Sequence, residues 1–231
     1  MADREQFLAH VRARIQAGGA RAHEHYQPTV APDSVWTPDR PRPPVWEPSA
    51  DELPERFLAE LRALGGAGER LADTAAARDD IITLARQKGA TLLVRWGDAP
   101  TDALGVDAPL SAAGTRVAVW GRDADARDLA ATADIGLSSA EYAVAETGSL
   151  GLVTAPERGR AVTLLPPAYV AVVPVARLVP RVTDVIAHYA QAGPPPASLC
   201  FHTGPSRSAD IEQSLAIGVH APGEVHVLLV G

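Results

Sequence analysis

Helical and strand-like stretches alternate along most of the chain. Apolar residues recur at helical spacing in residues 4–17, 53–64, 74–88, 125–132 and 178–191. Short apolar runs typical of buried strands lie between or after them, at residues 91–96, 116–120, 134–137, 142–145, 150–154, 161–165, 169–173, 198–201 and 225–230. Because helices alternate with strands, the pattern predicts an α/β fold with a mostly parallel sheet flanked by helices.

Two stretches depart from this alternation. Strand-like pieces bunched between residues 134 and 173 predict a hairpin-rich insertion or an antiparallel edge. Residues 28–54 hold eight prolines, which exclude a helix or a central strand. Trp36 and Trp46 within that stretch favour an extended arm packed on the domain or on a neighbouring subunit, with a disordered tether as the alternative. We therefore expect a helix and proline-rich arm over residues 1–50 and an α/β domain over residues 51–231.

Composition narrows the classes of partner. A net charge of −7 excludes a broad electropositive surface for nucleic acid, although a local arginine site stays open. No apolar stretch reaches the roughly 18 residues of a membrane span, so we expect a cytoplasmic protein. The lone lysine, Lys88, makes Schiff-base chemistry a poor candidate. The single cysteine, Cys200, cannot hold an iron–sulfur cluster, and its apolar surroundings favour a buried structural thiol over a nucleophile.

The first polar cluster is Glu146-Thr147-Gly148-Ser149, which interrupts apolar sequence between two predicted strands. Gly148 permits a positive φ, so the segment predicts a tight turn that carries the hydroxyls of Thr147 and Ser149. A plain hairpin turn is one interpretation. The functional interpretation places Glu146 at a sheet edge, facing a cleft, where its carboxylate can act as nucleophile or base.

The second polar cluster follows the apolar run that ends at residue 201. Its candidate ligand-binding residues are Gly204, Pro205, Ser206, Arg207, Ser208 and Asp210. A loop at the carboxyl end of a strand is where open α/β sheets bind ligands. Ser206 or Ser208 can cap a short helix beginning near Ala209, whose free N–H groups would bind an anion together with Arg207. Alternatively, Asp210 and Glu212 already use those N–H groups and pair with Arg207.

His220 lies in a sharp loop fixed by glycine and proline. It could serve as a proton donor or orienter at neutral pH, or be an ordinary hydrogen-bonded loop residue. A Ser206–Asp210–His220 triad has no support from spacing. His202, His226 and Asp210 match no zinc pattern, so we expect no metal site.

These segments carry a resemblance to a known family. Residues 146–149, 164–166 with 169–170, and especially 203–212 with 218–222 resemble the lactate-utilization (LUD) domain family, from about residue 55 to the C-terminus. Ser208 stands where that family usually has threonine, and Ala221 where it usually has glycine. The second departure concerns the loop of His220.

The resemblance implies a fold similar to ribose-5-phosphate isomerase, glucosamine-6-phosphate deaminase and the CoA transferases. It also implies a role in oxidising L-lactate to pyruvate, with iron–sulfur clusters in partner subunits and no cofactor bound by this chain. In related folds a glutamate attacks a thioester, and Glu146 would be its counterpart.

Three hypotheses follow from these observations. The chain is an accessory component that binds a small carboxylate, a phosphorylated ligand or a partner protein. Alternatively, it is an independent enzyme acting on a sugar phosphate or acyl-CoA thioester through Glu146. The third hypothesis, compatible with either, is a homo-oligomer whose proline-rich arm docks on a second subunit.

Overall fold

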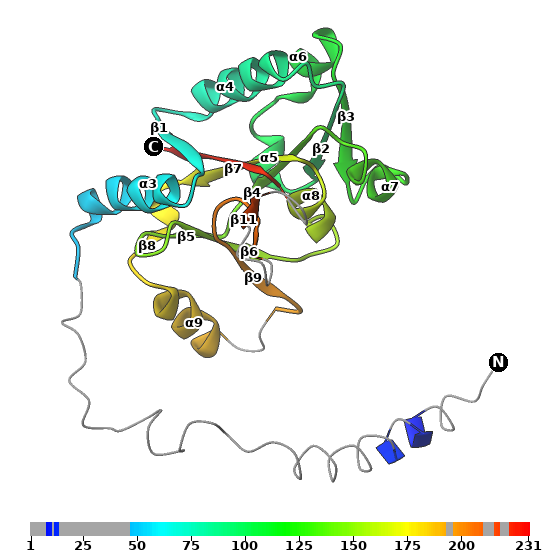
Figure 1. Cartoon of the computed structure of the whole chain (residues 1–231). Coiled ribbons are helices and arrows are strands. Elements are labelled where there is room, and N and C mark those ends of the chain that lie inside the picture. The colour runs from blue at the N-terminus through cyan, green and yellow to red at the C-terminus, as the bar shows by residue number, and fades with distance from the viewer. Residues whose placement is uncertain (1–7, 11, 14–46, 193–195, 210–214, 218–221) are drawn as a thin grey trace, which may run out of the picture. The chain divides into compact units, whose positions relative to one another are not determined.

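The computed structural model describes residues 8–10, 12–13, 47–192, 196–209, 215–217 and 222–231 (Figure 1). The chain divides into two units, Met1–Val45 and Trp46–Gly231. Residues 8–10 and 12–13 are helical, within the helix predicted for residues 4–17. Trp36, Trp46 and most of the proline-rich stretch lie outside the described residues, so the packed arm stays a prediction.

The main sheet of the second unit is parallel throughout. In the part of the chain that is described, its strand order is β1-β12-β7-β4-β2-β3. The strands are β1 (Ala67–Leu71), β2 (Leu92–Trp96), β3 (Arg116–Trp120), β4 (Ile135–Ser139), β7 (Ala168–Pro174) and β12 (Glu224–Val230). The predicted α/β architecture with a mostly parallel sheet is therefore confirmed.

A second, mixed sheet contains the hairpin predicted between residues 134 and 173 and has the strand order β8-β5-β6-β9, with β5 and β8 parallel. Its strands are β5 (Tyr142–Val144), β6 (Ser149–Val153), β8 (Leu178–Val179) and β9 (Leu199–His202). β5 and β6 form a hairpin, and β9 pairs antiparallel with β6 at the sheet edge. Beyond β9, the short strands β10 (Arg207–Ala209) and β11 (Leu215–Ile217) pair antiparallel with each other.

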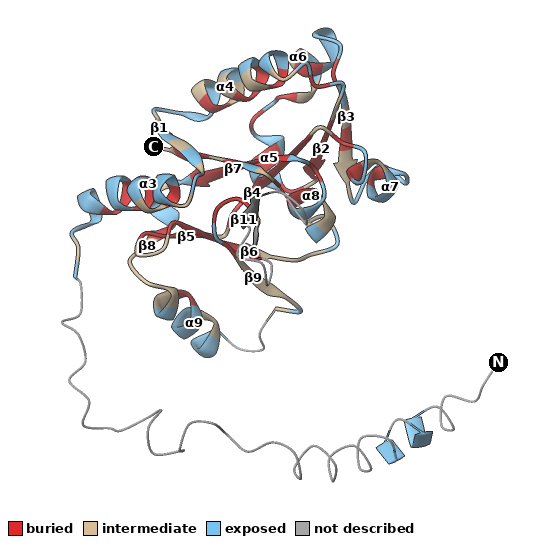
Figure 2. Ribbon diagram, viewed as in Figure 1, coloured by how far each residue is buried: buried red, intermediate tan, exposed pale blue. Residues whose placement is uncertain are grey.

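Helices cover the sheets in layers, as Figures 1 and 2 show. The α-helices are α3 (Leu53–Ala63), α4 (Thr74–Gln87), α5 (Ala99–Asp102), α6 (Asp107–Ala112), α7 (Ala126–Ala130), α8 (Arg160–Leu164) and α9 (Val182–Gln191), and the 3-10 helices are η1 (Ala50–Glu52) and η2 (Val175–Arg177). One hydrophobic cluster joins α4 and α6 to one face of the main sheet. Another joins the opposite face to α3, α8 and the second sheet, whose outer face packs against α9.

The helices predicted over residues 53–64 and 74–88 are confirmed as α3 and α4, whereas residues 161–165 were predicted as a strand and form α8 instead. The helix predicted over 178–191 begins later, because residues 178–179 pair with β5 and Pro180 interrupts the chain before α9.

α8 lies directly on β4. A Cβ added at Gly136 would come 2.0 Å from the carbonyl oxygen of Val162, so this helix depends on the missing side chain.

Candidate ligand-binding site

Strand β9 directs Cys200 and His202 toward the main sheet. The two residues are two positions apart, so their side chains share one face of the strand. They lie opposite Leu152 and Leu150 of β6, both of which belong to the core between the two sheets. β9 therefore places a thiol and an imidazole side by side along this interface.

His202 is held flat against an aromatic ring. Its imidazole stacks on Tyr169, with ring centroids 5.0 Å apart and planes inclined by 8°. The Tyr169 hydroxyl lies 2.7 Å from the Ser138 hydroxyl, which fixes the tyrosine in turn. Only 9% of His202 is exposed, and this burial lowers its pKa to about 4, against the opposing effect of a hydrogen bond to the Gly204 backbone. The ring is therefore neutral at pH 7, and its Nδ1 has no hydrogen-bond partner among the described residues.

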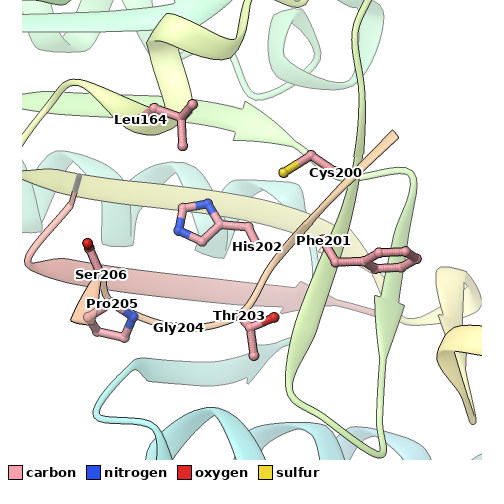
Figure 3. A pocket seen from close by; sticks show the side chains of 8 residues that line it. All are labelled: Leu164, Cys200, Phe201, His202, Thr203, Gly204, Pro205 and Ser206. Carbon is pink, nitrogen blue, oxygen red and sulfur yellow. The ribbon is translucent and has the colours of Figure 1, made fainter. Parts of the chain in front are cut away.

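A cavity of about 360 Å³ opens beside this ring (Figure 3). Its lining residues come from the end of α8, from β9 and from the loop that follows β9; they are Leu164, Cys200, Phe201, His202, Thr203, Gly204, Pro205 and Ser206. Figure 3 shows the imidazole between Leu164 and the Pro205–Ser206 turn. Apolar walls with a few polar groups are typical of small-molecule sites, which makes this cavity the candidate binding site.

The loop after β9 is fixed at two points. Gly204 adopts φ +67°, and a Cβ there would lie 2.9 Å from Cβ of Leu64, just beyond α3. The Ser206 N–H donates to the Pro222 carbonyl at 3.0 Å, two residues before β12. Of the residues predicted from the Gly-Pro-Ser segment, Gly204, Pro205 and Ser206 therefore stand in a defined conformation at the cavity.

The first polar cluster, residues 146–149, contacts this loop at Thr203, directly before the second cluster. The Ser149 hydroxyl lies 2.8 Å from the Thr147 hydroxyl and 2.8 Å from the Thr203 hydroxyl, so three side chains form a continuous hydrogen-bonded chain. Gly148, at φ +62°, is covered by α3, since an added Cβ would lie 2.5 Å from the Leu61 nitrogen. The β5–β6 turn and the loop after β9 thus form one unit, although more than fifty residues separate them.

The match to the model of the LUD domain covers residues 54–230. The chain belongs to the LUD domain family. The resemblance noted in the sequence is thereby confirmed, and the cavity, both polar clusters and the two sheets all lie within the LUD domain.

Curated relatives share one name, lactate utilization protein C. The protein from Oceanobacillus iheyensis is 39% identical over 106 residues, 44% of this chain and 46% of the relative. Those from Halalkalibacterium halodurans and Bacillus subtilis are 37% and 38% identical, over 56% and 51% of this chain. The matched stretches span about half the length of these relatives, at 46%, 58% and 51%.

A solved structure supports the fold. A DUF162 family protein from Deinococcus radiodurans superposes with a TM-score of 0.53 and 21% sequence identity, covering 80% of this chain and all of that one. This likeness shows a shared α/β fold. The further likeness to the sugar-phosphate isomerase and CoA transferase folds stays a prediction. No helix in the described part of the LUD protein is both long and apolar enough to cross a membrane.

Glu146 occupies a different position from the one predicted. Its carboxylate Oε1 accepts a hydrogen bond from the Val182 N–H at 2.8 Å, at the first residue of α9, and its own N–H donates to the Pro180 carbonyl. Glu146 is not among the residues that line the cavity. The observed contact anchors a helix, and a catalytic role for Glu146 stays a prediction.

The short helix predicted to begin near Ala209 is wrong. Arg207, Ser208 and Ala209 form β10, with Arg207 opposite Ile217 and Ala209 opposite Leu215. Pairing with β11 uses an extended backbone, so the anion site expected from a helix N-terminus loses its basis. The preceding strand, β9, also belongs to the antiparallel sheet, so the rule for carboxyl ends of open parallel sheets does not apply. Asp210 and His220 lie outside the described residues, and their roles stay predictions.

Cys200 departs from expectation as well. It was predicted to be a buried structural thiol, yet it is partly exposed and lines the cavity. The reason is topological, because β9 is at the edge of its sheet and pairs only with β6 among the described strands. His226, considered earlier with His202 as a metal ligand, faces Glu224 at 3.5 Å and does not line the cavity. Within the described residues, no three potential metal-ligating side chains gather.

A further polar cluster, which was not predicted from the sequence, lies at the carboxyl ends of β2 and β4. Chain order reverses between these neighbouring strands, which is where open α/β sheets commonly bind ligands. Asp98, with 2% of its side chain exposed, accepts from the Ser139 hydroxyl at 2.6 Å and lies 3.1 Å from Arg158 Nε. That nitrogen is close enough for an ion pair but not aligned for a hydrogen bond. Arg158 also donates to Glu141, so these groups largely satisfy one another.

Proposed function

We propose that this LUD protein is a component of a lactate utilization system and binds a small hydroxy- or oxo-carboxylate in the cavity beside His202. The relatives named lactate utilization protein C support the system, at 37–39% identity over about half their length. The observation that carries the ligand site is the cavity at the loop after β9, whose lining residue Thr203 is linked to the first polar cluster through the hydroxyls of Ser149 and Thr147.

The size and chemistry of the cavity suit such a ligand. A volume of about 360 Å³ holds a molecule of a few heavy atoms, with room for water. His202, Thr203 and Ser206 offer hydrogen-bonding groups, while Leu164 and Pro205 offer apolar contact. We assign the carboxylate to Arg207, which directly follows Ser206 and would supply a forked donor for it.

Electron transfer belongs elsewhere in this proposal. The sequence contains one cysteine, whereas an iron–sulfur cluster normally needs four thiolates. We therefore propose that iron–sulfur partner subunits in the cytoplasm carry the redox chemistry of converting L-lactate to pyruvate, and that this chain binds the acid. An independent enzyme acting on a sugar phosphate or acyl thioester has less support, because Glu146 contacts α9 and does not line the cavity.

Calorimetry tests the ligand site directly. L-lactate, pyruvate, a sugar phosphate and coenzyme A are titrated into the wild type, Arg207→Ala and Arg116→Ala. Arg116 is a matched control, because it pairs with Asp125 on the surface of β3, away from the cavity. We expect lactate or pyruvate to bind the wild type and the control alike, and the Arg207 variant about tenfold more weakly.

Cys200 offers an independent readout. As the single cysteine and a lining residue, its alkylation by iodoacetamide reports occupancy of the cavity. Bound acid should slow that reaction. Absence of binding by either acid, with unchanged alkylation, would refute the ligand site. Preferential binding of coenzyme A or a sugar phosphate would favour the alternative enzyme.

A further inference from the structure

The unpaired nitrogen of His202 defines what the cavity can recognise. The hydrogen bond to the Gly204 backbone favours the charged form of the ring and so raises its pKa. The backbone group involved is therefore the carbonyl, which accepts a hydrogen bond from a ring N–H. Since Nδ1 has no partner within the described chain, Nε2 is the donor in that bond. The neutral ring therefore carries its proton on Nε2 and presents Nδ1 as a bare acceptor.

The orientation of this acceptor is fixed. Stacking on Tyr169 at 5.0 Å holds the ring plane, and the Gly204 contact holds its rotation. Tyr169 is itself buried and paired with Ser138. A ring flip that hid Nδ1 elsewhere would break the Gly204 bond. The unsatisfied nitrogen therefore has a fixed direction, on a residue that lines the cavity.

We propose that Nδ1 of His202 accepts a hydrogen bond from the hydroxyl of a bound 2-hydroxy acid, so that the cavity selects the hydroxy form over the 2-oxo form of the same acid. This inference rests on the proposed function and specifies the ligand class of that site. A hydroxyl supplies the missing donor. A ketone oxygen has lone pairs only, so it would leave Nδ1 unsatisfied and repel it.

Nδ1 is closed to solvent in this arrangement, so the ligand reaches it through a small shift of the cavity wall. Leu164 stands on that side of the ring in Figure 3, at the end of α8, with 37% of its surface exposed. An exposed side chain at a helix end moves at little cost. A movement of Leu164 would open this side of the ring, and Leu164 belongs to α8 and not to either sheet.

The test compares affinities for L-lactate and pyruvate in the wild type, His202→Phe, His202→Asn and the control His188→Phe. We expect the wild type to prefer lactate about tenfold, the effect of one satisfied against one unsatisfied acceptor. Phenylalanine keeps the stack but removes the acceptor, so the preference should vanish. Asparagine offers an amide oxygen near Nδ1 and should restore part of it. His188→Phe makes the same exchange on α9, where the ring contacts Tyr142 and does not line the cavity, and should keep the preference.

Nitrogen NMR of the imidazole gives a second readout. The free protein should show the Nε2-protonated form, and lactate but not pyruvate should shift the Nδ1 resonance. Equal or tighter binding of pyruvate, a preference retained by His202→Phe, or a proton found on Nδ1 would overturn this inference while leaving the proposed function intact. Failure of both acids to bind would overturn the two together.

Discussion

His202 links the stability of the folded chain to pH. Its pKa is lowered to about 4 in the folded state, mainly by burial, against about 6.5 when unfolded. Between these values the unfolded chain binds a proton that the folded chain does not. Stability contributed by the neutral ring is therefore fully present above pH 6.5 and is lost as pH falls toward 4.

We expect this loss to be on the order of 3 kcal/mol between pH 7 and pH 4. Urea denaturation of the wild type and His202→Phe at several pH values measures it. Protonation of carboxylates with a lowered pKa, such as Asp134 and Glu224, also destabilises the folded chain in acid. The informative quantity is therefore the difference in free energy of unfolding between the two proteins. A difference that stays constant from pH 7 to 4 would show that His202 does not titrate in this way.

Replacing Gly148 and Gly89 by alanine separates the cost of backbone strain from the cost of a steric clash. Both adopt positive φ, +62° and +60°, so alanine is strained at either position by about 1 kcal/mol. At Gly89 an added Cβ meets nothing within 4 Å, whereas at Gly148 it meets the Leu61 backbone at 2.5 Å. We expect Gly148→Ala to lose about 2 kcal/mol more than Gly89→Ala in urea denaturation. Equal losses in the free energy of unfolding would mean that α3 shifts to accommodate the added Cβ at no energetic cost.

The residues of the site were only partly predictable from sequence. Polar residues that interrupt apolar sequence indicated the turn at 146–149 and the loop that begins at Gly204, although the short helix expected within the second segment was wrong. His202 was considered from the sequence only as a possible metal ligand. Its stacking partner, Tyr169, lies more than thirty residues earlier, and nothing local indicates which buried histidine lacks a hydrogen bond.

Among the secondary-structure elements, α9 depends on a side chain from outside it. Glu146 accepts from the Val182 N–H at 2.8 Å, satisfying one of the unpaired donors in the first turn. We expect Glu146→Ala to lower the free energy of unfolding by about 1 kcal/mol, and Glu146→Gln, which keeps an acceptor oxygen, by less. Glu69→Ala, on the exposed edge strand β1, serves as the control. If the alanine variant were as stable as the control, Glu146 would not support α9, and its catalytic role would regain weight.

Elements whose stability comes from distant partners were the ones mispredicted. β1 was missed because its residues are mostly exposed and its pairing partner, β12, lies at the other end of the domain. Residues 161–165 are apolar and partly β-branched, a pattern that fits a buried strand or a buried helical turn equally well. Gly136 favours the helix, because the absence of a side chain there lets α8 pack directly on β4.

For the whole molecule, periodicity indicated the α/β class but not the order of strands. Parallel pairing joins segments far apart in the chain, such as Ala67 with His226, and no local pattern records it. β12 therefore lies between β1 and β7, where it completes the sheet. Its side chains alternate between the two layers, with Val227 and Leu229 in one hydrophobic cluster and Leu228 in the other.

This alternation makes β12 a probe of cooperativity. Leu228 and Leu229 are neighbours in sequence, almost fully buried, and face opposite layers. Because both layers are built on one sheet, we expect Leu228→Ala and Leu229→Ala each to lower stability by about 3 kcal/mol within a single unfolding transition. Urea denaturation of chains with Trp36 and Trp46 replaced by phenylalanine, followed by circular dichroism and by tryptophan fluorescence, tests this, since the remaining Trp96 and Trp120 both pack in the Leu229 layer. If the two signals separated in either variant, the layers would unfold independently, and the sheet would not couple the ligand cavity to the α4–α6 face.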